Sequence, residues 1–172
     1  EEAVSLHEKH EPWITQKIKD EWKFFRRFKE NLNYNPNISD VAVEKMDTST
    51  NEIMDFLVDP NLPGPWDKRG MVKGYVQSGK TMSYCGLINK ALDVGYRFII
   101  VLSGRANDLR AQTQMRIDAD VIGLDSEAKS RNEIKYIGVG EHNDEALRKL
   151  RVNTATTILK DFNKQMAIQN GL

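Results

Sequence analysis

The sequence predicts an α/β fold in which a parallel sheet carries helices on both faces, preceded by an α-helical arm. Three observations predict it. Strand-like and helix-like segments alternate after residue 60, a continuous apolar run lies at residues 97–102, and a glycine-rich turn joins a predicted strand to a predicted helix. Such alternation is typical of parallel sheets, whose strands are joined by helical crossovers. We therefore predict an arm at residues 1–60 and an α/β domain at residues 61–172.

The composition is that of a folded protein without a strong charge. The chain has 172 residues, 25 Lys+Arg against 25 Asp+Glu, and 40% hydrophobic residues. Zero net charge excludes a strongly basic nucleic-acid-binding protein, although it permits a local basic patch. The longest apolar run is too short to cross a bilayer, and the first residues lack the pattern of a signal peptide. With Cys85 as the single cysteine, these features favour a soluble, cytoplasmic protein.

The arm is expected to be helical. Apolar residues recur at the helical period over residues 13–32, opposite a basic face that is expected to be solvated. Ser39 is predicted to cap a short helix through Met46, and residues 49–52 form a capping box that predicts another helix. We expect the aromatic face of the first helix to pack on the α/β domain, on a further part of the protein or on a partner subunit. That face comprises Trp13, Trp22, Phe25 and Phe28.

Strands and helices are predicted to alternate after the proline-rich linker at residues 60–65. Strands are predicted at residues 70–76, 97–102, 134–139 and 155–159. Helices are predicted at residues 80–94, 107–118, 144–150 and 161–169. The helix that begins at Lys80 is expected to stop at Gly95, because glycine readily adopts the left-handed conformation that ends helices. Cys85 is expected to be a small packing residue within it.

The segment at residues 74–81 reads Gly-Tyr-Val-Gln-Ser-Gly-Lys-Thr, a full match to the phosphate-binding pattern G-x-x-x-x-G-K-[ST]. Its glycines permit a tight turn that exposes backbone N–H groups, and the following helix directs its positive dipole end toward the same anion. We expect the catalytic pair Lys80 and Thr81 to contact the β- and γ-phosphates of ATP and to ligate Mg²⁺, respectively. The cradle is predicted to consist of Gly74, Gln77, Ser78, Gly79, Lys80 and Thr81.

Other sequence signatures of nucleotide-binding proteins narrow the class of protein to which this phosphate-binding turn belongs. Residues 89–92 read Asn-Lys-Ala-Leu, so the guanine-specific pattern N-K-x-D is not met. No predicted strand after Thr81 ends in the acidic residue of a Walker B motif, and residues 134–141 come nearest. Without that carboxylate, Mg²⁺ is poorly held and water is poorly activated. The chain alone is therefore expected to bind ATP and to lack turnover.

Three separated stretches resemble, in order, the Z-one domain, a family described as endonucleases. They are residues 69–81, residues 95–104 continued by 107–114, and residues 156–164. The resemblance implies a helicase-like, RecA-type P-loop ATPase of bacterial DNA restriction or anti-phage systems. It also implies that the Walker B motif and a second half with an arginine finger lie further along, so that this sequence is the N-terminal part of a longer protein.

Arg105, Arg110 and Gln112 follow the second predicted strand. In helicase-like folds the corresponding loop touches the nucleic-acid backbone, and arginine and glutamine suit phosphate contacts. We take these three residues as the predicted DNA contacts. The alternative is a solvated helix face whose arginines pair with neighbouring aspartates.

Two other functions remain open from the sequence. A small-molecule kinase would share the phosphate-binding turn but would ignore DNA. A non-catalytic interaction module would bind the nucleotide as a structural or switching ligand. Stimulation of ATP turnover by DNA would separate the helicase-like ATPase from both.

Overall fold

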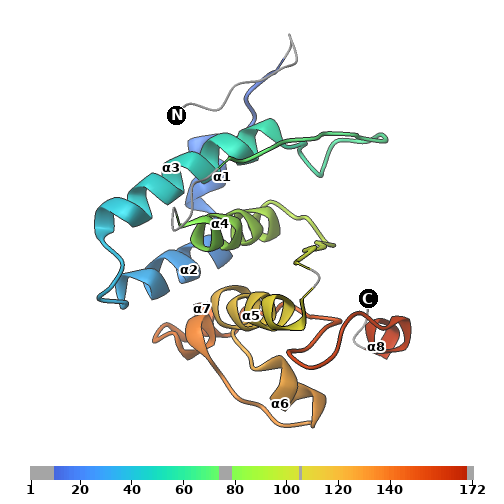
Figure 1. Ribbon diagram of the computed structural model, residues 1–172. Coiled ribbons are helices and arrows are strands. Elements are labelled where there is room, and N and C mark those ends of the chain that lie inside the picture. Colours follow the sequence, from blue (N-terminus) through green and yellow to red (C-terminus); the bar gives the residue numbers. More distant parts are fainter. Residues whose placement is uncertain (1–9, 74–78, 105, 170–172) are drawn as a thin grey trace. The chain divides into compact units, whose positions relative to one another are not determined.

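The computed structural model describes residues 10–73, 79–104 and 106–169 (Figure 1). The regular secondary structure of these residues is helical, and no β-strand occurs among them. One isolated antiparallel bridge joins Leu124 to Tyr136. The chain divides into two compact units, unit 1 over Glu1–Ile99 and unit 2 over Ile100–Leu172.

Each unit has its own set of helices. Unit 1 contains α1 (Gln16–Asp20), α2 (Phe24–Asn33), α3 (Asp40–Phe56) and α4 (Lys80–Asp93). Unit 2 contains α5 (Asn107–Ile117), the π-helical turn η1 (Asp118–Ile122), α6 (Ser126–Ser130), the 3-10 turn η2 (Gly138–Glu141), α7 (Glu145–Arg148) and α8 (Lys164–Gln169). None of the helices in the described residues is long and apolar enough to cross a membrane.

The predicted parallel sheet with helices on both faces is wrong for the described part of the chain. The run at residues 97–102 is not a strand, and most of its side chains are exposed, Ile100 by 68% and Leu102 by 90%. Residues 134–139 contribute one bridge, and residues 155–159 form no strand. An apolar run becomes a buried strand only where neighbouring strands and helices cover it. The described residues provide no such cover, so the P-loop NTPase fold class is corrected to a helical one.

Several helices form where the sequence predicts them. The predicted helices at residues 80–94 and 107–118 correspond to α4 and α5, and Gly95 ends the first with a φ of 102°. The predicted helices at residues 144–150 and 161–169 are shorter in the structure, as α7 and α8. Local signals place these helices correctly because each depends mainly on residues close in sequence.

Unit 1 is built on the packing of α4 against α2 and α3 (Figure 1). The aromatic face predicted for the first helix is largely buried here, at Trp22, Phe25 and Phe28. Gly86 of α4 permits the close approach, because a Cβ at that position would lie 2.6 Å from Sδ of Met46 and 3.6 Å from the Phe28 ring. The aromatic stripe therefore packs within unit 1.

The predicted continuous helix at residues 13–32 is interrupted at residues 21–23, between α1 and α2. The carboxylate of Asp93, the last residue of α4, accepts hydrogen bonds from the backbone N–H groups of Lys23, Phe24 and Phe25 at 2.8, 2.9 and 2.8 Å. These are orphan donors of the α2 N-terminus, which has no side-chain cap of its own. Burial raises the pKa of the Asp93 carboxyl, although the three N–H bonds oppose that shift.

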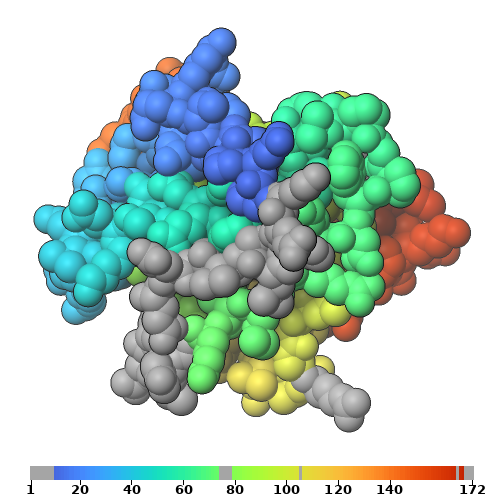
Figure 2. Space-filling model, turned by 90° about the horizontal axis from the view of Figure 1, so that it is seen from above, coloured from blue at the N-terminus to red at the C-terminus, as the bar shows by residue number. Residues whose placement is uncertain are grey.

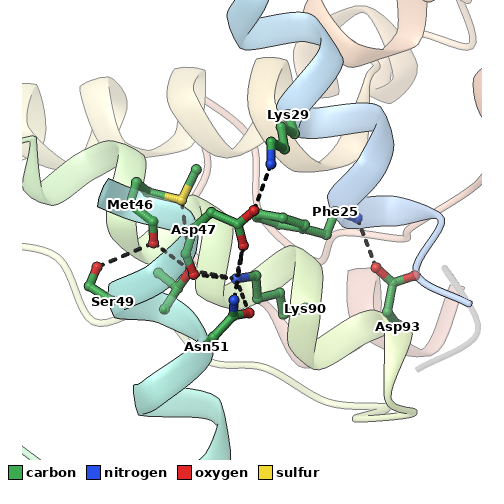
Figure 3. Close-up of polar contacts among 9 residues, drawn as sticks. Phe25, Lys29, Met46, Asp47, Ser49, Asn51, Lys90 and Asp93 are labelled. Carbon is green, nitrogen blue, oxygen red and sulfur yellow. Dashed lines mark hydrogen bonds and ion pairs between the residues drawn. The ribbon is translucent and has the colours of Figure 1, made fainter. Parts of the chain in front are cut away.

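One predicted cap in the arm is confirmed and one is wrong. The Ser39 hydroxyl accepts a hydrogen bond from the Ala42 N–H and begins α3. The capping box at residues 49–52 lies inside the same helix, where Ser49 donates to the Met46 carbonyl at 3.2 Å (Figure 3). A single helix therefore replaces the two that were predicted, because α3 continues through the second capping signal.

The residues before α1 are held on α3. The Asp55 carboxylate accepts hydrogen bonds from the N–H groups of Trp13 and Ile14 at 2.9 and 3.0 Å, and His10 Nε2 lies 2.8 Å from it. Figure 2 shows the blue residues that follow residue 9 beside the turquoise α3 in unit 1. Burial alone would raise the pKa of Asp55, but these hydrogen bonds outweigh it and lower that pKa.

A buried ammonium group joins α4 to α3. Lys90 is fully buried, and its Nζ donates to Asp47 Oδ1, Thr50 Oγ1 and Asn51 Oδ1 at 2.9, 2.8 and 2.6 Å (Figure 3). The Phe25 ring lies 4.0 Å from the same nitrogen. Burial lowers the pKa of Lys90 to about 8, although the hydrogen bond that Lys90 donates to Asp47 opposes that shift.

Asp47 holds this group together with a second lysine. Lys29 of α2 contacts the other carboxylate oxygen of Asp47 at 2.7 Å. Burial alone would raise the pKa of Asp47, but the hydrogen bonds from Lys29 and Lys90 outweigh it and hold that pKa below its ordinary value. One carboxylate therefore links α2, α3 and α4. The charged groups that surround Lys90 are Asp47, Lys29 and, from α1, Lys19.

Unit 2 is organised around the buried carboxylate of Asp118. Gln114 Nε2 and the Ser126 hydroxyl donate to it at 2.7 and 2.6 Å, and Gln114 Oε1 accepts from Thr156 at 2.6 Å. Burial raises the pKa of Asp118, and the hydrogen bonds from Ser126 and Gln114 oppose that shift. The network ties α5, η1, the start of α6 and the loop at residues 154–157 into one unit.

We predict that the free energy of unfolding of the wild type rises with pH above about pH 8, and that Lys90→Met lacks this rise. The lowered pKa means that the unfolded chain binds more protons than the folded chain between about pH 8 and pH 10.5. The free energy of unfolding should therefore rise across that window, by up to roughly 3 kcal/mol relative to Lys90→Met. Urea unfolding at several pH values measures this difference. Lys29→Met, which removes the half-exposed partner of Asp47, should keep the rise. A difference between wild type and Lys90→Met that does not vary with pH would contradict the prediction.

We also predict that Gly140→Ala destabilises unit 2. The added Cβ would overlap the carbonyl oxygen of Gly123, so the backbone must shift. Overpacking of this kind costs about 1–3 kcal/mol. Gly70→Ala is the matched control, because no atom lies within 4 Å of a Cβ there. Urea unfolding followed by circular dichroism should show a large effect for Gly140→Ala alone, and equal effects would refute the steric explanation.

Candidate nucleotide site

The candidate nucleotide site is the N-terminus of α4. Gly79 precedes the helix with φ 75° and ψ 20°, a left-handed conformation that glycine adopts without steric cost. Its carbonyl oxygen accepts from the Ser83 N–H at 3.0 Å, which closes the first turn. Lys80 and Thr81 follow as exposed residues of that turn. No acidic residue occupies the first turn, so the positive end of the helix dipole is not opposed there.

The other half of α4 fixes the helix in place. Cys85 is buried, as predicted, and so are Asn89 and Lys90. The Asn89 side chain donates to the Cys85 carbonyl at 2.8 Å, within the helix. The helix is therefore held by its C-terminal half, while its N-terminal turn faces solvent. An anion at Lys80 would meet a preoriented turn of backbone.

The structure brings together part of the predicted cradle. Gly79, Lys80 and Thr81 lie together at the start of α4. Gly74, Gln77 and Ser78 lie outside the described residues. The observed part of the site is thus one left-handed glycine, one lysine and one threonine in consecutive positions.

The described residues contain no group of three or more His, Cys, Asp or Glu side chains that could hold a metal ion. Mg²⁺ is commonly held by one or two carboxylates, with substrate phosphates and water completing its octahedron. The first turn of α4 supplies no carboxylate, so Thr81 offers a single hydroxyl ligand there. A magnesium ion here would depend on the phosphates of the nucleotide for most of its ligands.

The three predicted DNA contacts differ in where the structure places them. Arg105 lies outside the described residues, and Gln112 is an exposed residue of α5. Arg110 donates to the carbonyl oxygens of Thr157 and Ile158 at 2.9 and 2.6 Å. Its guanidinium therefore holds the loop before α8 rather than extending into solvent.

Sequence analysis missed a second group of basic residues in unit 2. A pocket of about 490 Å³ is lined by Tyr136, Gly140, Glu141, Arg148, Lys149 and Arg151. The signal that could have found it is the run Arg-Lys-Leu-Arg at residues 148–151, with three cations in four positions. Tyr136 has no such signal, because the bridge to Leu124 that positions it is not local in sequence.

We predict that Gly79→Ala lowers the free energy of unfolding by about 1 kcal/mol, because a residue with a Cβ is strained in the left-handed region. Space is not the cause, since a Cβ at Gly79 would meet only the end of the Met82 side chain, at 3.7 Å. Gly79→Asn should cost less, because asparagine tolerates this conformation. Urea denaturation of the three proteins tests the order, and an equal loss in both variants would contradict it.

No protein-family model, curated protein or solved structure matches the chain. The resemblance to the Z-one domain therefore stays a prediction from the motifs in the sequence. What the described residues contribute is a helix N-terminus with the residue types of a phosphate site and a separate basic pocket in unit 2.

Proposed function

We propose that this chain binds ATP with Mg²⁺ through residues 74–81, as part of a helicase-like ATPase that acts on DNA in a bacterial restriction or anti-phage system. The observation that carries the proposal is the exposed Lys80–Thr81 pair, directly after a left-handed glycine at the start of an anchored helix. A helix N-terminus attracts phosphate through its backbone N–H groups and its positive dipole end, and neither depends on a neighbouring sheet.

Each residue has a distinct part in this proposal. The Lys80 ammonium would contact the β- and γ-phosphates, while the Thr81 hydroxyl would ligate Mg²⁺. Bound Mg²⁺ would neutralise charge on the phosphates. Since the first turn of α4 carries no carboxylate to hold the metal or orient water, we propose that this chain alone retains ATP without hydrolysing it. Turnover coupled to DNA would require further acidic and arginine residues. We place this function in the cytoplasm.

A second candidate is a non-catalytic interaction module that binds the nucleotide as a switch. The exposed apolar side chains of Ile100, Val101 and Leu102 in unit 2 favour it, because contiguous exposed apolar residues commonly mark interaction surfaces. This candidate shares the nucleotide site, but it predicts that DNA has no effect on nucleotide turnover.

Calorimetric titration of the chain with Mg·ATP tests the nucleotide site. We expect Lys80→Ala to weaken binding by about 10- to 100-fold, because a hydrogen bond to a charged group contributes about 1.5–3 kcal/mol. Lys45→Ala is the matched control, since Lys45 is an exposed lysine of α3 in the same unit. Its affinity should equal that of the wild type.

Two results would overturn the proposal. One is the absence of heat with the wild-type chain, and the other is an equal loss of affinity in Lys80→Ala and Lys45→Ala. The metal role of Thr81 predicts that Thr81→Ala binds ATP as tightly as the wild type in EDTA and more weakly than the wild type in Mg²⁺. The two candidate functions are separated on a form of the protein that includes the further acidic and arginine residues and hydrolyses ATP. Stimulation of that turnover by DNA would favour the ATPase over the interaction module.

A further inference from the structure

The basic pocket of unit 2 lies where Tyr136, η2 and α7 meet. Its cations are Arg148, Lys149 and Arg151, and its acidic residue is Glu141. Lys149 is paired with Glu145 at 2.6 Å. Among the described residues, no carboxylate lies within ion-pair distance of either arginine. The pocket therefore holds a local excess of positive charge in a chain whose net charge is zero.

Arg151 is held in a defined orientation. Its Nη1 donates to the carbonyl oxygens of Arg148 and Leu150 at 2.5 and 3.1 Å, and its Nη2 donates to the Tyr136 hydroxyl at 3.3 Å. The guanidinium lies 5.5 Å from the centre of the Tyr136 ring. These bonds use three of its five N–H groups, so one on Nε and one on Nη2 remain for a ligand. An oriented guanidinium of this kind suits phosphate oxygens.

The shape and the aromatic residue indicate more than a single phosphate. The pocket volume, about 490 Å³, exceeds the size of one phosphate group. Tyr136 is 40% exposed beside the guanidinium, so a ring and a planar cation face solvent together. Bases of single-stranded nucleic acids stack on such aromatic and arginine planes, while cations contact the adjoining phosphates.

We propose that this pocket binds single-stranded DNA, with Arg148 and Arg151 contacting phosphates and Tyr136 providing a stacking surface. The inference rests on the proposed function for its choice of DNA, and it names where that DNA binds. It replaces Arg110 as the main contact, because the Arg110 guanidinium donates to backbone carbonyls. Arg148, by contrast, is exposed and lies at the end of α7.

Fluorescence anisotropy of a labelled oligothymidylate of about 12 nucleotides, without nucleotide present, tests the pocket. We expect Arg148→Ala and Arg151→Ala each to weaken binding about tenfold and to reduce the slope of log affinity against log salt by about 0.7 per lost phosphate contact. Tyr136→Leu should weaken binding by at least fivefold while keeping an apolar side chain. Arg131→Ala is the matched control, an exposed arginine of unit 2 beside Glu133 and outside the pocket, and it should change affinity less than twofold.

Several outcomes would overturn this proposal. They are no binding by the wild type, an equal loss in Arg131→Ala, or competition by inorganic triphosphate as effective as unlabelled oligothymidylate at equal phosphate concentration. The last would assign the pocket to a small polyanion. An unchanged helical circular-dichroism signal shows that each variant is folded. Lys80→Ala should lose ATP binding and bind the oligonucleotide like wild type. A wild-type chain that binds the oligonucleotide but not Mg·ATP would overturn the proposed ATP site alone.

Discussion

The interaction on which unit 1 depends is the buried ion pair between Lys90 and Asp47. A lysine with no exposed surface loses its hydration, and the carboxylate, the neighbouring polar oxygens and the Phe25 and Trp22 rings compensate for part of that loss. Removing one partner of such a pair is costly, since it leaves the other charge buried without compensation. The pair therefore fixes α4 against α3, and the bond from Lys29 to Asp47 includes α2 in the same arrangement.

This constraint bears on the candidate nucleotide site. Lys80 and Lys90 lie ten residues apart on one helix, about 15 Å along its axis. One lysine is buried and orders the helix, whereas the other is exposed on its first turn. Asp93 adds a second anchor by capping α2. A binding turn gains from this division of roles, because a ligand that meets an ordered backbone loses less free energy to ordering it.

The parts of this fold that could be predicted from the sequence are those set by neighbouring residues. The bounds of α4, the Ser39 cap and the stop at Gly95 follow from local chemistry. The sheet was predicted wrongly, because the apolar run at residues 97–102 identifies a strand only if other segments pair with it. The cap that Asp93 provides could not be predicted either, since its partners lie 68 to 70 residues away. The burial of Lys90 could not be predicted either, because lysine side chains are usually exposed.

The candidate sites differ in how the sequence reveals them. The nucleotide site has a contiguous pattern, because a phosphate-binding turn is made by consecutive residues. The pocket of unit 2 combines a basic run with Tyr136, which lies outside that run, so only the structure brings the ring and the guanidinium together. Zero net charge gives the chain no long-range attraction for a polyanion. Any DNA binding must then come from such local clusters, and neutralising a single arginine in one should have a large effect.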